Sequence, residues 1–149
     1  MATNTILQSL NPVEDGSGVT ASNRRQIESY LAAGSIAAGD LVALDITQTE
    51  SADRMLYVVA ADTSSGDTTV GVGFALADAA SGETVDVVVS GYVANANVAT
   101  GGGAGDRIIA SGTAGRAGRY VDTSTQVIIG YQVAAATSNT ADVIVLKQF

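Results

Sequence analysis

The sequence predicts an all-β fold: a compact β-barrel or sandwich of short strands built from two similar units, with one short N-terminal helix and an extended N-terminal arm. Three observations predict this fold. Short apolar or alternating runs recur along the 149-residue chain, clusters of turn-forming residues separate them, and the same order of sequence blocks occurs twice. The length is that of one domain, which can bury a sizeable core without disulfides or metals.

The N-terminal segment, residues 1–21, differs from the rest of the chain. Its stretch 11–18, Asn-Pro-Val-Glu-Asp-Gly-Ser-Gly, is rich in turn formers and has no apolar periodicity. We therefore interpret residues 1–21 as an extended arm that becomes ordered against a neighbouring molecule. Pairing as an edge strand is the alternative. Residues 22–149 are expected to form a single β domain.

One short helix is predicted over residues 23–33. Asn23 has the side chain of a helix N-cap. Ile27, Tyr30 and Leu31 follow with the i, i+3, i+4 spacing of one helical face. This is the only helix that the sequence predicts.

Strands are predicted from residue 36 onward. Short apolar runs, separated by clusters rich in Gly, Ser, Thr or Asp, cover residues 41–44, 55–60, 70–76, 85–89, 107–112, 127–133 and 143–146. Many short strands separated by turns are typical of a barrel or a sandwich.

The order of the sequence blocks predicts an internal duplication, with units of about residues 34–93 and 98–149. Residues 38–42 match 104–108, residues 70–79 match 127–136, and residues 86–89 match 142–145. Two copies are too few for a solenoid, so we expect both units to share one compact core.

Composition argues against an enzyme. The chain has no cysteine and no histidine, which removes thiolate sites, the usual general base and the commonest zinc ligand. We therefore expect no catalytic residue, no metal and no cofactor. The net charge of −8 disfavours nucleic acid as a partner. No apolar run is long enough to span a membrane, and the N-terminus lacks the features of a signal peptide.

Two acidic or glycine-rich patterns resemble functional motifs but have simpler interpretations. The segment Gly101–Asp106 precedes a predicted strand, whereas a phosphate-binding loop opens a helix, so we interpret it as a surface loop. The carboxylate pairs Asp62 with Asp67 and Asp78 with Glu83 flank predicted turns and are interpreted as solvated hairpin tips.

The two adjacent arginines, Arg24 and Arg25, are conspicuous because basic residues are scarce. Within a helix, Arg24 would pair with Glu28 at i, i+4. The alternative is a contact with another subunit or with a capsid.

Three segments resemble the capsid decoration (cement) proteins of tailed phages. In residues 72–93 a glycine-containing apolar strand is followed by small residues, a Gly-Glu turn and a valine-rich strand that ends in Gly-Tyr. Residues 23–26 and 38–45 also resemble stretches of tailed-phage structural proteins. The similarity covers roughly residues 22–149.

This resemblance implies a β domain on the outer surface of an icosahedral head, made in the host cytoplasm and assembled as a homotrimer. It implies the major capsid protein as the partner and capsid stabilisation as the function. The expected capsid or intersubunit contacts are Ile6, Leu7, Leu10, Pro12, Val13, Arg24 and Arg25.

Three alternatives remain at this point. The first is a carbohydrate- or cell-surface-binding β module, for which Tyr92, Tyr120 and Tyr131 are the candidate contact residues. The second is another virion component such as a tail subunit. The third is a small enzyme that uses carboxylates.

Overall fold

The structure is a computed structural model, and it describes residues 25–64, 71–121 and 126–147. These residues contain nine β-strands and no α-helix, so the predicted all-β class is confirmed. The strands are β1 (Arg25–Ala32), β2 (Leu41–Leu44), β3 (Tyr57–Ala60), β4 (Gly71–Ala75), β5 (Thr84–Asn97), β6 (Arg107–Ala110), β7 (Ala117–Arg119), β8 (Gly130–Gln132) and β9 (Thr140–Val145). A 3-10 turn, η2 (Asp53–Met55), lies between β2 and β3.

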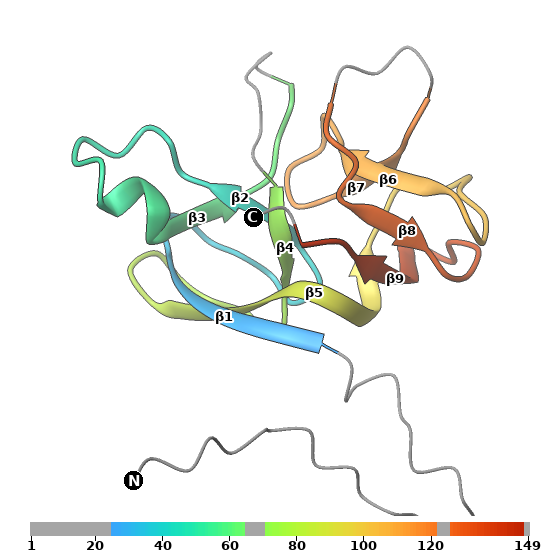
Figure 1. Cartoon of the computed structure of the whole chain (residues 1–149), viewed down its shortest axis with the longest axis horizontal. Helices are drawn as coiled ribbons and strands as arrows, with labels where there is room; N and C mark the ends of the chain where they lie inside the picture. The colour runs from blue at the N-terminus through green and yellow to red at the C-terminus, as the bar shows by residue number, and fades with distance from the viewer. Residues whose placement is uncertain (1–24, 65–70, 122–125, 148–149) are drawn as a thin grey trace, which may run out of the picture.

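A single sheet contains all nine strands, in the order β1-β3-β2-β4-β5-β9-β8-β6-β7. Because β1 pairs with both β3 and β5, five strands form a closed ring of pairings. A bridge between Val98 and Ala117 links β7 to the end of β5 and closes a second ring. We name these the N-terminal ring (residues 25–90) and the C-terminal ring (residues 91–147). Figure 1 shows them side by side, joined by β5.

The predicted helix over residues 23–33 is wrong, because residues 25–32 form strand β1. This strand pairs along its length with β5 and, at its end, with β3. Tyr30 and Ala32 are buried whereas Ile27 is exposed, which is the alternation of a strand. The spacing of the apolar residues was compatible with both structures, and the long-range pairing with β5 decides between them.

Each ring begins its second strand with the same tight turn. Gly39 and Gly105 have φ angles of 84° and 87°, in the left-handed region that glycine favours. In each turn the next residue is an aspartate whose carboxylate accepts a backbone N–H three residues earlier. The two bonds run from Ala37 N to Asp40 Oδ2 at 3.0 Å and from Gly103 N to Asp106 Oδ2 at 2.8 Å.

Equivalent strands of the two rings also pair in the same register. In the N-terminal ring, Phe74 of β4 lies opposite Leu41 of β2 and Val88 of β5. In the C-terminal ring, Tyr131 of β8 lies in the same way opposite Arg107 of β6 and Ile144 of β9. The match continues into the first strand of each ring, where Tyr30 with Val85 corresponds to Ala96 with Ala141. We infer that the chain contains two copies of one five-stranded unit, which share strand β5.

The buried residues form two clusters. One fills the N-terminal ring, around Val42, Val58 and Val87. The other fills the C-terminal ring, around Ile108 and Val143, and also includes Leu41, Phe74 and Val88 from the outer side of the N-terminal ring. The part of the outer side that contains Leu41, Phe74 and Val88 is therefore buried against the C-terminal ring.

Candidate interaction surfaces

Six of the seven predicted contact residues, those from Ile6 to Arg24, lie outside the described residues. The seventh, Arg25, is the first residue of β1, where it is exposed and lies opposite Gly91 of β5. The capsid contact therefore stays a prediction.

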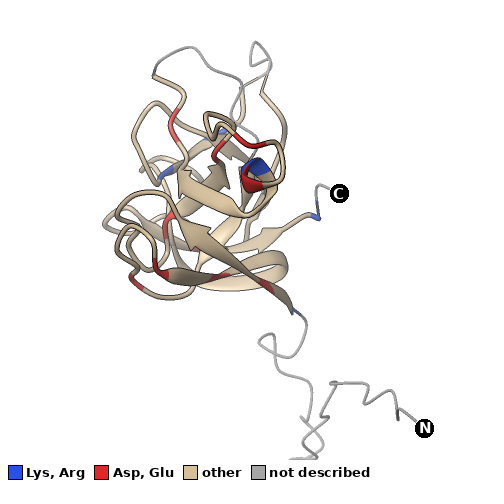
Figure 2. Cartoon of the chain, turned by 90° about the vertical axis from the view of Figure 1, so that its left-hand side faces the viewer, with Lys and Arg blue, Asp and Glu red and all other residues tan. Residues whose placement is uncertain are grey.

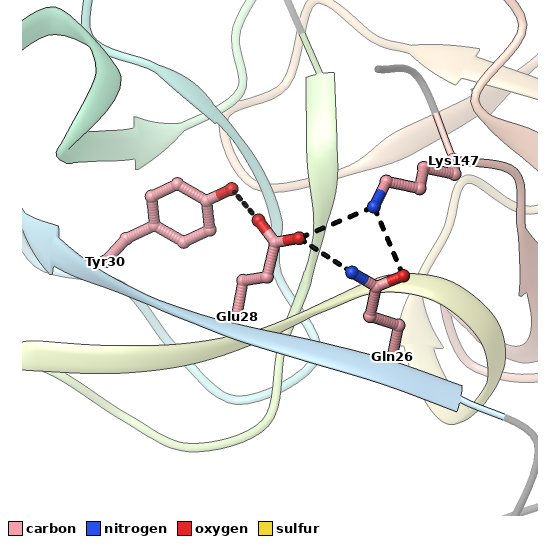
Figure 3. Close-up of polar contacts among 4 residues, drawn as sticks. All are labelled: Gln26, Glu28, Tyr30 and Lys147. Carbon is pink, nitrogen blue, oxygen red and sulfur yellow. Dashed lines mark hydrogen bonds and ion pairs between the residues drawn. The ribbon is translucent and has the colours of Figure 1, made fainter. Parts of the chain in front are cut away.

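Glu28 has a different environment from the one the helix predicted, as Figure 3 shows. Its carboxylate accepts hydrogen bonds from Gln26 at 2.9 Å and from the Tyr30 hydroxyl at 2.8 Å, and it lies 3.8 Å from the ammonium of Lys147. Burial, together with the hydrogen bond to Glu28, raises the pKa of Tyr30 above its ordinary value. The exposed ion pair adds little stability, but the cluster joins the end of the C-terminal ring to β1.

Carboxylates elsewhere bind the polypeptide itself. Asp78 accepts the N–H of Ala38 at 2.8 Å, and Glu83 accepts the N–H of Ala80 at 2.8 Å, at the edge of a shallow hollow lined by Ser35 and Ile36. Asp62 accepts the N–H of Ser64 at 2.8 Å, whereas Asp67 lies outside the described residues. Within residues 25–64, 71–121 and 126–147, no three acidic side chains gather into a group that could hold a metal ion.

The loop between β2 and β3, residues 46–56, begins at a nearly buried carboxylate. Asp45 accepts hydrogen bonds from the backbone N–H and the hydroxyl of Thr47, at 3.0 and 2.6 Å, and from the amide of Gln48 at 2.7 Å. Burial opposes ionisation of Asp45, but these hydrogen bonds outweigh it and lower the pKa. Beyond this anchor, Ile46, Met55 and Leu56 are all more than half exposed. We name residues 46–56 the β2–β3 loop.

Replacing Asp45 by asparagine tests this anchor. Because the pKa of Asp45 is lower in the folded protein, its carboxylate contributes fully to stability when the pH is above the pKa of an unfolded aspartate, about 3.9. This contribution is lost as the pH falls through the lower pKa of the folded protein. The change Asp45→Asn should therefore cost about 1–2 kcal/mol of unfolding free energy at neutral pH and flatten its decline in acid. Urea unfolding at several pH values measures both. Parallel pH profiles for the two proteins would contradict this role of Asp45.

A row of four side chains, three of them exposed, crosses the outer side of the C-terminal ring. Tyr92 pairs with Ile144, Ile144 with Tyr131, and Tyr131 with Arg107, so all four side chains lie on one face of the sheet. Tyr131 and Ile144 are 39% and 44% exposed. Val133 and Leu146, which directly follow β8 and β9, are also exposed. We name these six residues the tyrosine face.

Two tyrosines in this region have polar neighbours. The hydroxyl of Tyr92 donates a hydrogen bond to Asp142 at 2.6 Å, and this bond raises the pKa of Tyr92. The guanidinium carbon of Arg107 lies 5.6 Å from the centre of the Tyr120 ring, which is within the range of a cation–π contact. The three tyrosines suggested for a carbohydrate site thus lie in one region, but Tyr92 and Tyr120 are half-buried and only Tyr131 is exposed.

The tyrosine face corresponds to a buried surface in the N-terminal ring. Its residues Arg107, Tyr131 and Ile144 are equivalent, by strand register, to Leu41, Phe74 and Val88, whose exposed fraction is 0%. The C-terminal ring covers that equivalent row. In the corresponding row of the C-terminal ring, Tyr131 and Ile144 remain exposed.

Sequence reasoning did not identify Arg107, Val133, Ile144 and Leu146 as surface residues. Their signal is present in the sequence, since Ile144 and Leu146 alternate with Val143 and Val145 at the end of β9 and just after it. That alternation contains apolar residues on both sides, and only the structure shows which side is exposed.

The described residues contain no helix that is both long and apolar enough to cross a membrane. No family model matches the chain. No curated protein sequence matches it either.

A similarity was found among solved structures. The crystal structure of the N base of the head fiber gp8.5 of bacteriophage phi29 aligns with a TM-score of 0.53 and 18% sequence identity. The alignment covers 82% of this chain and 94% of that chain. At this identity the similarity concerns the fold, and it shows that this chain shares its all-β architecture with the base of a phage head fiber.

Proposed function

We propose that this protein is a structural component of a phage virion that decorates the outer surface of the icosahedral head and stabilises it by binding the major capsid protein. One observation carries the proposal: the fold is similar to that of a head-fiber base over 94% of the latter's chain. The resemblance of residues 72–93 to phage decoration proteins supports the same assignment independently.

The described residues suit a binding role better than a catalytic one. The carboxylates of Asp40, Asp45, Asp78 and Glu83 all accept hydrogen bonds from nearby turns or loops. Such contacts stabilise a rigid fold, and they engage the groups that a carboxylate-dependent reaction would need. Many copies of a rigid domain, each burying a modest area on the shell, would together bind strongly through avidity.

In this proposal the protein acts as a homotrimer, and the N-terminal arm makes the capsid contact. An extended segment can cover much of a partner's surface while it becomes ordered on binding. The arm leads into Arg25 at the start of β1, so its contacts would be transmitted directly to the N-terminal ring.

Deleting residues 2–20 tests the arm. The truncated protein should keep its cooperative unfolding transition, because the deletion removes none of the nine strands that the described residues form. Its affinity for phage heads that lack this protein should fall at least about tenfold, a loss of about 1.4 kcal/mol. Co-sedimentation with such heads, for full-length and truncated protein, measures the change. Equal affinities would contradict a capsid contact made by the arm.

A carbohydrate-binding module is the alternative function, and the tyrosines bear on it. A sugar platform needs accessible aromatic faces, but Arg107 lies over the Tyr120 ring and the Tyr92 hydroxyl is bound to Asp142. These contacts favour the decoration function. A tail location would show itself by binding to tails rather than heads in the same sedimentation assay.

A further inference from the structure

We propose that the tyrosine face of one copy binds the β2–β3 loop of a second copy, so that the subunits associate head to tail. This inference specifies the interface of the oligomer and rests on the proposed function. Three independent features support it: a contact between the two rings of one chain, the exposed apolar residues of both surfaces, and the distribution of charge.

The contact between the two rings provides the precedent. The loop between β6 and β7 reaches the N-terminal ring, where Leu41 N donates to Gly115 O at 2.8 Å and Gly115 N donates to Ala61 O at 3.0 Å. Ala110 and Ala117, which border this loop, belong to the same buried cluster as Leu41 and Phe74. Within one chain, this loop therefore packs at the row that is equivalent to the tyrosine face.

The β2–β3 loop is the counterpart of that loop in the N-terminal ring. Both loops are closed by the same backbone hydrogen bond, from Asp45 N to Tyr57 O at 2.9 Å and from Ser111 N to Arg116 O at 3.1 Å. The β6–β7 loop meets a row on its own chain, whereas Tyr131 and Ile144 of the tyrosine face are 39% and 44% exposed. A second copy can supply the missing contact with its own β2–β3 loop.

Both surfaces expose apolar side chains of suitable size. On the β2–β3 loop, Ile46, Met55 and Leu56 are 51%, 57% and 52% exposed. On the tyrosine face, Tyr131, Ile144 and Leu146 are the main exposed apolar groups. Contact between the two surfaces would remove both sets from water, which is the main driving force of association.

Charge complements this apolar match. Residues 25–90 contain ten acidic and two basic side chains, a net charge of −8, whereas residues 91–149 contain three acidic and four basic side chains, a net charge of +1. Figure 2, which views the molecule from the side of the N-terminal ring, shows the acidic residues on several of its segments. Association of a basic-to-neutral ring with an acidic ring is favoured, whereas two N-terminal rings repel each other.

The two surfaces lie at opposite ends of the molecule. Figure 1 shows the segment between β2 and β3, which includes η2, at one side of the molecule and β8 at the other. Contacts between two different surfaces of the same chain generate rings when the rotation closes. Each copy offers one loop and one face, and in the trimer of the proposed function the rotation closes after three copies.

Two single substitutions and their mixture test the interface. Ile144→Glu places a charge on the tyrosine face, and Met55→Glu places one on the β2–β3 loop; Ile27→Glu on exposed β1 is the matched control. Light scattering of the full chain measures mass against the 14.9 kDa of one chain. We expect wild type and the control to be oligomers, and each test variant to associate about 100-fold or more weakly.

The mixture gives the decisive result. The intact loop of the Ile144→Glu protein can bind the intact face of the Met55→Glu protein, so an equimolar mixture should form pairs of twice the chain mass while each variant alone stays monomeric. Circular dichroism confirms that both variants fold, and Ile144→Lys and Met55→Lys replace any that does not. An oligomeric Met55→Glu protein, or a mixture that stays monomeric, would overturn the proposal.

The same proteins separate this inference from the proposed function. A wild-type protein that is monomeric at high concentration but sediments with phage heads overturns the interface and leaves decoration intact. If the Ile144→Glu change abolishes head binding by such a monomer, the capsid protein rather than a second copy occupies the tyrosine face. Binding of soluble glycans at this face would also refute a second copy as its partner.

Discussion

Alanine at Gly73 or Gly130 is expected to destabilise the protein by about 2–4 kcal/mol at either position. These glycines occupy equivalent positions in β4 and β8, one in each ring. A Cβ atom on Gly73 would collide with the carbonyl oxygen of Val88, and one on Gly130 would collide with the carbonyl oxygen of Ile144. Both collisions are with the backbone of the neighbouring strand, so only separation of the paired strands relieves them.

Gly34→Ala is the matched control for these substitutions. An added Cβ at Gly34 would have no heavy atom within 4 Å, and its φ is not in the left-handed region. This change should leave stability unaltered or raise it by about 0.4–1 kcal/mol. Urea unfolding of the three variants measures the differences. Equal stability of Gly73→Ala and Gly34→Ala would show that the strands do not approach as closely as described.

Phe74→Ala is expected to cost about 3–5 kcal/mol, because it removes a fully buried ring from the larger core cluster. Tyr131→Ala, at the equivalent position of the second unit, should cost less than about 1 kcal/mol in an isolated subunit, because that ring is 39% exposed. Two equivalent positions thus differ strongly in the expected loss of stability, since the C-terminal ring covers only Phe74.

The pair is measured by denaturant unfolding at a concentration where the protein is monomeric. At higher concentration Tyr131→Ala should become more costly, because its partner surface is then a second copy. Similar costs for Phe74→Ala and Tyr131→Ala in the monomer would mean that the two outer rows do not differ in burial, and this would remove the basis for the tyrosine face.

The match between sequence blocks of the two rings was visible in the sequence because its strongest signals are local, although the predicted units 34–93 and 98–149 do not have the bounds of the rings. The Gly-Asp turns at residues 39–40 and 105–106 and the glycines at 73 and 130 have backbone requirements that few residues can meet. The two rings therefore have the same residue types at these positions, whereas the apolar residues beside them differ. The strands that follow these turns were therefore predicted close to their observed bounds.

The structure of residues 25–32 was not predictable by the same reasoning. The segment Arg-Gln-Ile-Glu-Ser-Tyr-Leu-Ala contains good helix formers, and its conformation depends on β5, about sixty residues later. The equivalence of β1 with the second part of β5 rests on hydrogen-bond register rather than on shared residue types. Local propensity carries no information about such a pairing.

The candidate site was predictable only in part. Sequence reasoning identified Tyr92, Tyr120 and Tyr131 as aromatic residues of interest and assigned the contact with the capsid to the arm. It could not show that Tyr131 and Ile144 share an exposed row, because both belong to apolar runs that read as core. Which of two equivalent rows is covered depends on how the rings pack, and that is a property of the tertiary structure.

The most direct test of the decoration function is binding of the full-length protein to phage heads that lack it, followed by electron cryo-microscopy of the complexes. The account predicts saturable co-sedimentation and density for the protein on the outer surface of the shell, in contact with the major capsid protein. Absence of binding to heads, or density confined to the tail, would contradict it.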